Sequence, residues 1–233
     1  MNPMTELIRQ LSGIMQINGR AEPAAAAFIK DAEKAAKERN DLNTPLKELS
    51  FTVFDLETTG FFPQKQDRIL SIGAVKIKEN QLLDQTFYSC VHYDKAIPSD
   101  IRILTGLQEE DVSNAPAEQD VLTNFFHFME KDILVAHHAA HEKGFMQDAM
   151  WRSFRATFQR RLVDTVFLTR LYEPLKKTVN LEDCCKHFNI SADGRHHALS
   201  DARMTGELWL HTSEALSQNG IHTLKDVYRL LAR

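Results

Sequence analysis

The chain has 233 residues, of which 43 % are hydrophobic and 26 % are charged, and its formal net charge is −4. This length suits one globular domain with some additional structure. The weak negative charge excludes a protein that is basic over its whole surface, although a local basic groove remains compatible with it. No apolar run approaches the ~20 residues of a membrane helix.

The cysteines and the first residues bear on the compartment. Cys90, Cys184 and Cys185 are odd in number and two of them are adjacent, which makes a poor disulfide framework and favours a reducing environment. The opening MNPMTELIRQ lacks the basic region and apolar core of a signal peptide. We therefore expect a cytoplasmic protein without a membrane partner.

Residues 1–45 are predicted to form a helical appendage. In 4-MTELIRQLSGIMQ-16 the apolar residues recur at spacings of three and four, which is typical of one helix face. The segment 21-AEPAAAAFIKDAEKAAKERN-40 is rich in strong helix formers, and Pro45 marks a linker over 41–49. The appendage is interpreted either as a brace on the main domain or as a docking arm for a partner.

From Phe51 the pattern changes to mixed α/β. Strands are predicted at 51–57, 69–79, 82–93, 132–137 and 161–163, the first three joined as hairpins. Helices are predicted at 117–131, 139–155, 164–172, 180–188, 197–216 and within 222–233. This order predicts a mixed five-stranded sheet with helices on both faces. The expected divisions are 1–45, a main domain over 46–217, and a helical tail over 218–233.

The stretch 54-FDLETTGFF-62 places two acids at the end of the first strand. Residues two apart on a strand point to the same side, so Asp55 and Glu57 should project together. Two carboxylates beside a core repel each other unless a cation lies between them. The alternative is a strand end that has already reached solvent. The following Thr58, Thr59 and Gly60 favour a tight turn with exposed backbone.

Two further segments contain acids that could reach the same point. In the helix predicted after 135-VAHHAAHEKGF-145, Glu142 shares an apolar face with Phe145, whereas Asp148 points away from that face. In 194-GRHHALSDA-202, His196 and Asp201 are five apart, about 140° around a helix. They can converge only if His196 precedes the helix that contains Asp201. Taken alone, either of these two residues would more often be structural.

Together these residues predict a metal site. Four carboxylates without a nearby cysteine suit Mg²⁺ or Mn²⁺, and such ions can activate water for the hydrolysis of a phosphodiester. A histidine that titrates near neutrality is a suitable base. A zinc-protease site is disfavoured, because the order His138-Ala-Ala-His141-Glu142 matches neither HExxH nor HxxEH.

DLETTG, followed about 140 residues later by HHALSDA, resembles the DEDDh 3′–5′ exonucleases, the DnaQ-like proofreading-epsilon group. The similarity covers roughly residues 50–212, and 69-ILSIGAVKI-77, 105-TGLQEEDVSNAP-116 and 163-VDTVFLTRLY-172 support it. The resemblance implies a ribonuclease-H-like fold and hydrolysis of nucleic acid from a free 3′ end to 5′-nucleotides. Single-stranded DNA is the first choice of substrate and RNA the second.

The same resemblance assigns roles to single residues. It implies that Asp55, Glu57, Glu142 and Asp201 bind two divalent cations and that His196 is the general base. It further implies that Thr58, Thr59 and His137 contact the substrate. A polymerase or repair protein is the partner expected for residues 1–45.

The chain departs from the family at 137-HHAAHE-142, where the family has His-Asn-Ala-x-Phe-Asp. The extra methylene of Glu142 shifts the carboxylate by ~1.5 Å, against a tolerance of roughly 0.5 Å in a catalytic site. The alternative function is therefore a weak or inactive exonuclease fold that binds nucleic acid or tethers a partner. The segment 152-RSFRATFQRR-161 is interpreted as a charged helix exterior rather than a nucleic-acid-binding strip.

Overall fold

The computed structural model describes residues 23–37 and 41–232, and its centre is a five-stranded sheet with the order β3-β2-β1-β4-β5. The strands are β1 (Phe51–Thr58), β2 (Ile69–Lys78), β3 (Gln81–Cys90), β4 (Ile133–Ala136) and β5 (Leu162–Asp164). β1, β2 and β3 form an antiparallel meander, whereas β4 runs parallel to both β1 and β5. The predicted mixed sheet is confirmed.

A tight turn explains why β2 and β3 form a hairpin. Glu79 and Asn80 have φ values of 52° and 58°, and Lys78 pairs with Gln81 across them. Two successive residues with positive φ form the type of turn whose twist matches that of the flanking strands. The connection from β1 to β2 is longer and contains the 3₁₀ turn η2 (Pro63–Lys65).

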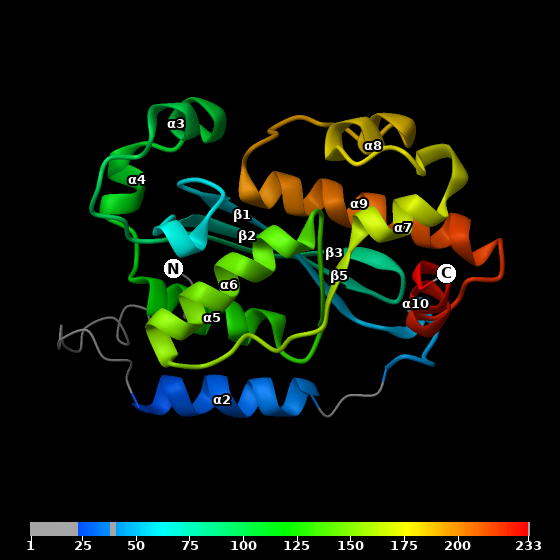
Figure 1. Ribbon diagram of the computed structural model, residues 1–233, viewed down its shortest axis with the longest axis horizontal. Helices are drawn as coiled ribbons and strands as arrows, with labels where there is room; N and C mark the ends of the chain where they lie inside the picture. The colour runs from blue at the N-terminus through cyan, green and yellow to red at the C-terminus, as the bar shows by residue number, and fades with distance from the viewer. Residues whose placement is uncertain (1–22, 38–40, 233) are drawn as a thin grey trace, which may run out of the picture.

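Helices cover both faces of the sheet (Figure 1). One face packs against α5 (Glu118–Met129) and α6 (Ala139–Phe154), and the other against α7 (Thr165–Leu171), α9 (Ala198–Ser217) and α10 (Leu224–Leu231). α8 (Leu181–His187) packs on α9. Because alternate strand residues point to opposite faces, Phe54 of β1 lies in the α5–α6 core and Val53 in the α9 core. No described helix combines the length and apolarity needed to span a bilayer.

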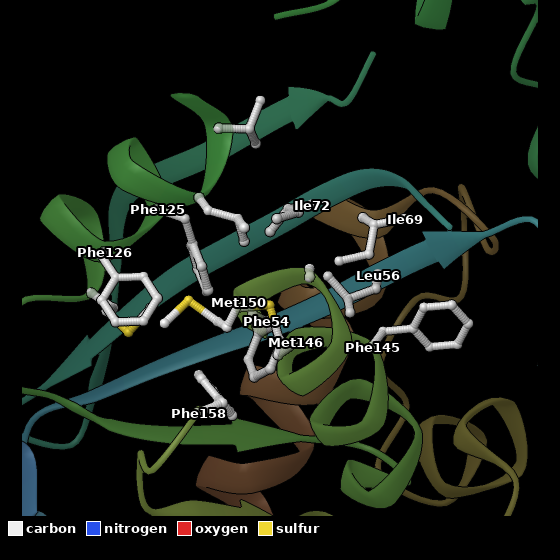
Figure 2. Packing of buried hydrophobic residues seen from close by; sticks show 14 of the residues in the cluster. Phe54, Leu56, Ile69, Ile72, Phe125, Phe126, Phe145, Met146, Met150 and Phe158 are labelled. Atoms are coloured by element: carbon white, nitrogen blue, oxygen red, sulfur yellow. The ribbon is translucent and has the colours of Figure 1, made fainter. Parts of the chain in front are cut away.

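The core on the α5–α6 side contains many aromatic and methionine side chains (Figure 2). Phe54 of β1 lies with its ring centroid 5.5 Å from that of Phe125 on α5. Met146 and Met150 of α6 are buried in the same cluster, near Phe54 (Figure 2). This packing fixes α6 against β1, and α6 contains the predicted ligand Glu142.

The helix α2 (Pro23–Lys37) is the described part of the predicted appendage, whose residues 1–22 lie outside the described range. Ile29 is fully buried in the same core, and Phe28 stacks on His127 with ring centroids 4.0 Å apart. Glu33 forms a buried ion pair with Arg160, Oε1 to Nε 3.1 Å. α2 therefore packs as a brace beside α5 (Figure 1).

The predicted linker and the tail contact each other. The amide of Leu46 donates to the carbonyl of His222 over 2.8 Å, and the amide of Lys225 donates to Leu42 over 3.0 Å. Leu46 and Leu224 are buried in the α9 core. The division of the chain at 45 and 217 stays a prediction.

Residues 94–116 were given no secondary structure in the sequence analysis, and they contain α3 (Ser99–Thr105) and α4 (Glu109–Ser113). The third strand was also predicted too long, since it ends at Cys90. Both helices are too short for a hydrophobic period to be recognised. Their local signals were present: Gly106 ends α3 in a left-handed conformation, and Gln108 and Asp111 form a capping box for α4.

Candidate active site

The acids predicted from DLETTG lie together with Asp201. Asp55 and Glu57 have the same parity along β1 as Val53, so they face α9 rather than α6. Ligand oxygens of Asp55, Glu57 and Asp201 all lie within 4.8 Å of one another. Among the described residues, these three acids form a group with the spacing of metal ligands, and the group contains no histidine.

The close approach of α9 to the sheet depends on Gly73. This residue is opposite Asp55 in the β1–β2 ladder. A Cβ at Gly73 would lie 2.1 Å from the amide nitrogen of Leu199 and 2.2 Å from the carbonyl carbon of Ala198. Backbone atoms cannot yield at such distances, so only glycine lets the first turn of α9 rest on β2. That contact brings Asp201 to Asp55.

Asp201 is buried, with 3 % of its surface exposed. Its Oδ2 accepts hydrogen bonds from the guanidinium of Arg195 and, over 3.3 Å, from the backbone amide of His196. Its Oδ1 is buried without a partner among the described residues. One oxygen is thus held by the protein, and the other is left for a ligand.

His196 lies in the loop before α9 with a left-handed φ of 63°, while Asp201 lies in the first turn of the helix. This is the arrangement that the five-residue spacing requires. Burial, followed by the charge of Arg195, lowers the pKa of His196 below its usual value, and Asp201 and Glu182 partly oppose that shift. This shift favours the neutral imidazole, the form that can accept a proton.

Glu142 reaches the site from the first turn of α6. It is 4 % exposed and shares the buried face of α6 with Phe145, Met146 and Ala149, as its spacing predicts. It lies outside the 4.8 Å group, yet its charge acts on Asp55. Its Oε2 is buried without a partner among the described residues.

Asp164 anchors the start of α6. Its carboxylate accepts hydrogen bonds from the amides of His138 and Ala139, both over 3.1 Å, and from the amide of Val166 over 2.9 Å. It therefore caps α6 and α7 together. This is the contact that fixes the end of α6 where Glu142 lies.

Burial and mutual repulsion raise the pKa values of these acids. Burial, then Asp201, raises the pKa of Glu57 to about 8. Burial, then Asp164 and Glu57, raises the pKa of Glu142 to about 8, although its own backbone amide opposes the shift. The pKa of Asp55 is raised well above its usual range by burial and by the charges of Glu142, Glu57 and Asp201. The raised pKa values indicate that the ionised acids are unfavourable together unless a positive charge lies beside them.

The residues fit divalent cations. Oxygen ligands from carboxylates are those that Mg²⁺ and Mn²⁺ prefer. Two buried carboxylate oxygens, Oδ1 of Asp201 and Oε2 of Glu142, lack partners among the described residues. Buried polar atoms of this kind are rare unless a ligand completes them. Asp55, Glu57, Asp201 and, from α6, Glu142 are the residues that would hold the ions.

Comparison with known sequences identifies the family. The RNase_T family, described as exonuclease, matches residues 52–209 of the chain. The chain belongs to the exonuclease family. The family and the enzyme class predicted from DLETTG and HHALSDA are confirmed. The match spans β1 to α9 and so includes every acid of the site.

Two similar bacterial proteins are much longer than the chain. The DNA polymerase III PolC-type of Clostridium perfringens is 35 % identical over 182 residues, which cover 76 % of this chain and 12 % of that protein. The 3′-5′ exonuclease DinG of Bacillus subtilis is 33 % identical over 183 residues, 77 % of this chain and 19 % of that protein. The chain thus spans less than a fifth of the length of these relatives.

Solved structures share the fold. Escherichia coli exonuclease I in complex with a dA16 oligonucleotide superposes with a TM-score of 0.65 at 13 % identity, covering 73 % of this chain and 42 % of that one. Exonuclease X in complex with 5′ overhanging duplex DNA gives a TM-score of 0.59 at 18 % identity, covering 76 % and 98 %. The predicted ribonuclease-H-like exonuclease fold is confirmed.

The turn that follows the acids is held by its own side chains. Thr58 Oγ1 donates to the carbonyl of Gly60 over 2.7 Å. Thr59 Oγ1 donates to Asp67 over 3.3 Å and accepts from the amide of Arg68 over 2.9 Å. Both threonines are buried. Their predicted contact with substrate stays a prediction, and their hydroxyls stabilise the turn.

His137 is buried with both ring nitrogens in use. Nδ1 is 2.7 Å from Thr165 Oγ1, and Nε2 is 2.8 Å from the carbonyl of Val179. Burial, partly opposed by the bond to Val179, lowers the pKa of His137 to about 4. The ring connects β4 to the segment before α8. Its predicted role in substrate binding also stays a prediction.

The segment 152–161 is only partly the charged helix exterior that the sequence predicts, because α6 ends at Phe154 and Arg160 is buried. Arg152 forms ion pairs with Glu118 and Asp148, and Arg160 pairs with Glu33. Phe154 and Phe158 are buried in the α5–α6 core. Their rings are therefore not available for bases.

Four residues at the site were missed in the sequence analysis. Arg195 contacts Asp201, Asp164 caps α6, and Phe61 and Phe62 expose 71 % and 48 % of their surfaces on the turn after β1. Phe61 lies with its ring centroid 6.0 Å from that of His141 on α6. Two consecutive phenylalanines directly after TTG were the available signal for an exposed aromatic surface.

Proposed function

We propose that the chain is a divalent-cation-dependent 3′–5′ exonuclease that removes 5′-nucleotides from the 3′ end of single-stranded DNA, with RNA as a second substrate. The observation that carries the proposal is the group formed by Asp55, Glu57 and Asp201, with ligand oxygens within 4.8 Å of one another. The sequence similarity to polymerase PolC and to the 3′-5′ exonuclease DinG supports DNA as the substrate and a 3′ end as the point of attack.

Each residue has a part in this reaction. Asp55, Glu57, Glu142 and Asp201 would hold two Mg²⁺ or Mn²⁺ ions, and such ions would supply Lewis-acid stabilisation of the phosphodiester and its leaving oxygen. His196 takes the proton from the attacking water, and the lowered pKa that favours its neutral ring suits that role. Phe61 and Phe62 offer exposed faces on which terminal bases can stack.

The test is a cleavage assay with 5′-labelled single-stranded DNA and RNA oligonucleotides in Mg²⁺ or Mn²⁺. We expect a ladder that shortens from the 3′ end and is lost in Asp55→Asn and in EDTA. Asp148→Asn is the matched control, because Asp148 pairs with arginines away from the acids. A folded wild-type protein that leaves both substrates intact with either metal would refute the proposal.

One observation favours a second candidate, a weak or inactive module that binds nucleic acid or a partner. Glu142 replaces the family's aspartate and lies outside the 4.8 Å group. For this candidate, a polymerase or repair protein would bind through residues 1–45, and the three free cysteines fit a cytoplasmic location. Strand binding without cleavage in the same assay would favour it.

A further inference from the structure

Arg195 contributes a positive charge directly beside the acids. Its guanidinium forms an ion pair with Oδ2 of Asp201. Its Nε is buried and has no hydrogen-bond partner among the described residues. The side chain is 23 % exposed, so the charge is only partly screened by water.

The influence of this charge extends beyond Asp201. Arg195 lowers the pKa values of both Asp55 and Glu57, against the larger effect of their burial. It also helps to depress the pKa values of His196, the next residue in the chain, and of His137. Because ligand oxygens of Asp55, Glu57 and Asp201 lie within 4.8 Å of one another, the guanidinium paired with Asp201 also lies near the acids of β1.

The fixed positive charge of Arg195 offsets part of the electrostatic repulsion among the acids. Several carboxylates enclosed together are costly unless positive charge accompanies them. Arginine suits this place because it stays protonated and its planar group can bind a carboxylate firmly. The same charge repels a divalent cation and shares the carboxylate that the cation needs.

We propose that Arg195 is the resident counter-ion of the acidic site and that its positive charge, held on Oδ2 of Asp201, weakens the binding of a divalent cation to the acids. This inference rests on the proposed function, since it assumes that the acids bind such ions. It makes Arg195 a residue that tunes metal affinity. The acids stay paired when the concentration of the ion is low, and the ion binds reversibly at the site.

The experiment is a calorimetric titration of the full chain with Mn²⁺ in chelator-free buffer, together with thermal melts in EDTA. Arg195→Gln should bind Mn²⁺ at least tenfold more tightly than the wild type and should melt at a lower temperature in EDTA. Arg195→Lys, which keeps the charge, should stay within threefold of the wild type. Arg203→Gln removes a charge from the same helix as Asp201 and should change neither quantity.

The opposite sign would overturn the inference. If the wild type binds Mn²⁺ but Arg195→Gln binds it equally or more weakly, then Arg195 positions Asp201 and does not compete with the ion. If no variant and no wild-type sample binds Mn²⁺ or Mg²⁺, the proposed function itself fails. Should Arg195→Gln not fold, Arg195→Lys decides, because a tenfold change in its Mn²⁺ affinity contradicts competition by charge.

Discussion

Two helices bring carboxylates to the same end of β1, but they do so by different means. α9 lies directly on β2 at Gly73, and its Asp201 falls within the 4.8 Å group. α6 packs through large side chains and is anchored by Asp164, and its Glu142 falls outside that group. Asp201, which α9 positions through a backbone contact, therefore lies closer to the acids of β1 than Glu142, which α6 positions through side chains.

The largest expected effect comes from Gly73→Ala. The new methyl group would meet the backbone of α9 at 2.1 Å, so the helix must move away from β1 and take Asp201 with it. A displacement of about 1 Å costs on the order of 100-fold in activity. Gly144→Ala in α6 is the control, since its Cβ would meet only Pro63 at 3.6 Å. Oligonucleotide cleavage rates measure both, and equal rates would show that α9 is not held by this contact.

The pH dependence of stability tests the raised pKa values of the buried acids Glu57 and Glu142. Glu57 and Glu142 have folded-state pKa values raised to about 8, above the ordinary 4.5. Protonation therefore stabilises the folded protein below pH 4.5, and this stabilisation is lost as the pH rises toward 8. In EDTA the free energy of unfolding should fall steadily over that window. Urea titrations that show stability rising with pH, after subtraction of a Glu57→Gln/Glu142→Gln reference, would contradict the assignment.

Asp164→Ala should loosen the α6 half alone. It removes a carboxylate that caps two helices, and loss of one cap costs about 1 kcal/mol, so about 2 kcal/mol is expected. Asp226→Ala, in the capping box of α10, is the matched control and should cost about half as much. Thermal unfolding measures both. Equal losses would mean that Asp164 does not hold α6 and α7 together.

Glu142→Gln should distinguish ion binding that depends on α6 from ion binding that depends on β1 and α9. The variant keeps the size of the side chain but removes its charge, so the ion nearest to α6 should bind about tenfold more weakly, ~1.4 kcal/mol. The ion held mainly by Asp55, Glu57 and Asp201 should bind as before. Calorimetry with Mn²⁺ resolves the two events. A single event that is unchanged in Glu142→Gln would place Glu142 outside the metal site.

The sequence was sufficient for much of this site because its main signals are local. The spacing within DLETTG orients Asp55 and Glu57, and the period of α6 buries Glu142. Arg195 and Asp164 could not be predicted, because their partners depend on how α6, α7 and α9 meet the sheet. The contact at Gly73 is of the same kind, since a glycine in a strand does not reveal which backbone lies over it.

The packing of α2 bears on where the folded exonuclease domain begins. Ile29 and Glu33 precede the family match at residue 52, yet Ile29 lies in the core and Glu33 forms a buried ion pair with Arg160. A fragment cut at the family boundary would lose that buried carboxylate and open a hole beside α5. Any displacement of α2 would accordingly disturb the interior of the exonuclease domain, because Ile29 and Glu33 are buried there.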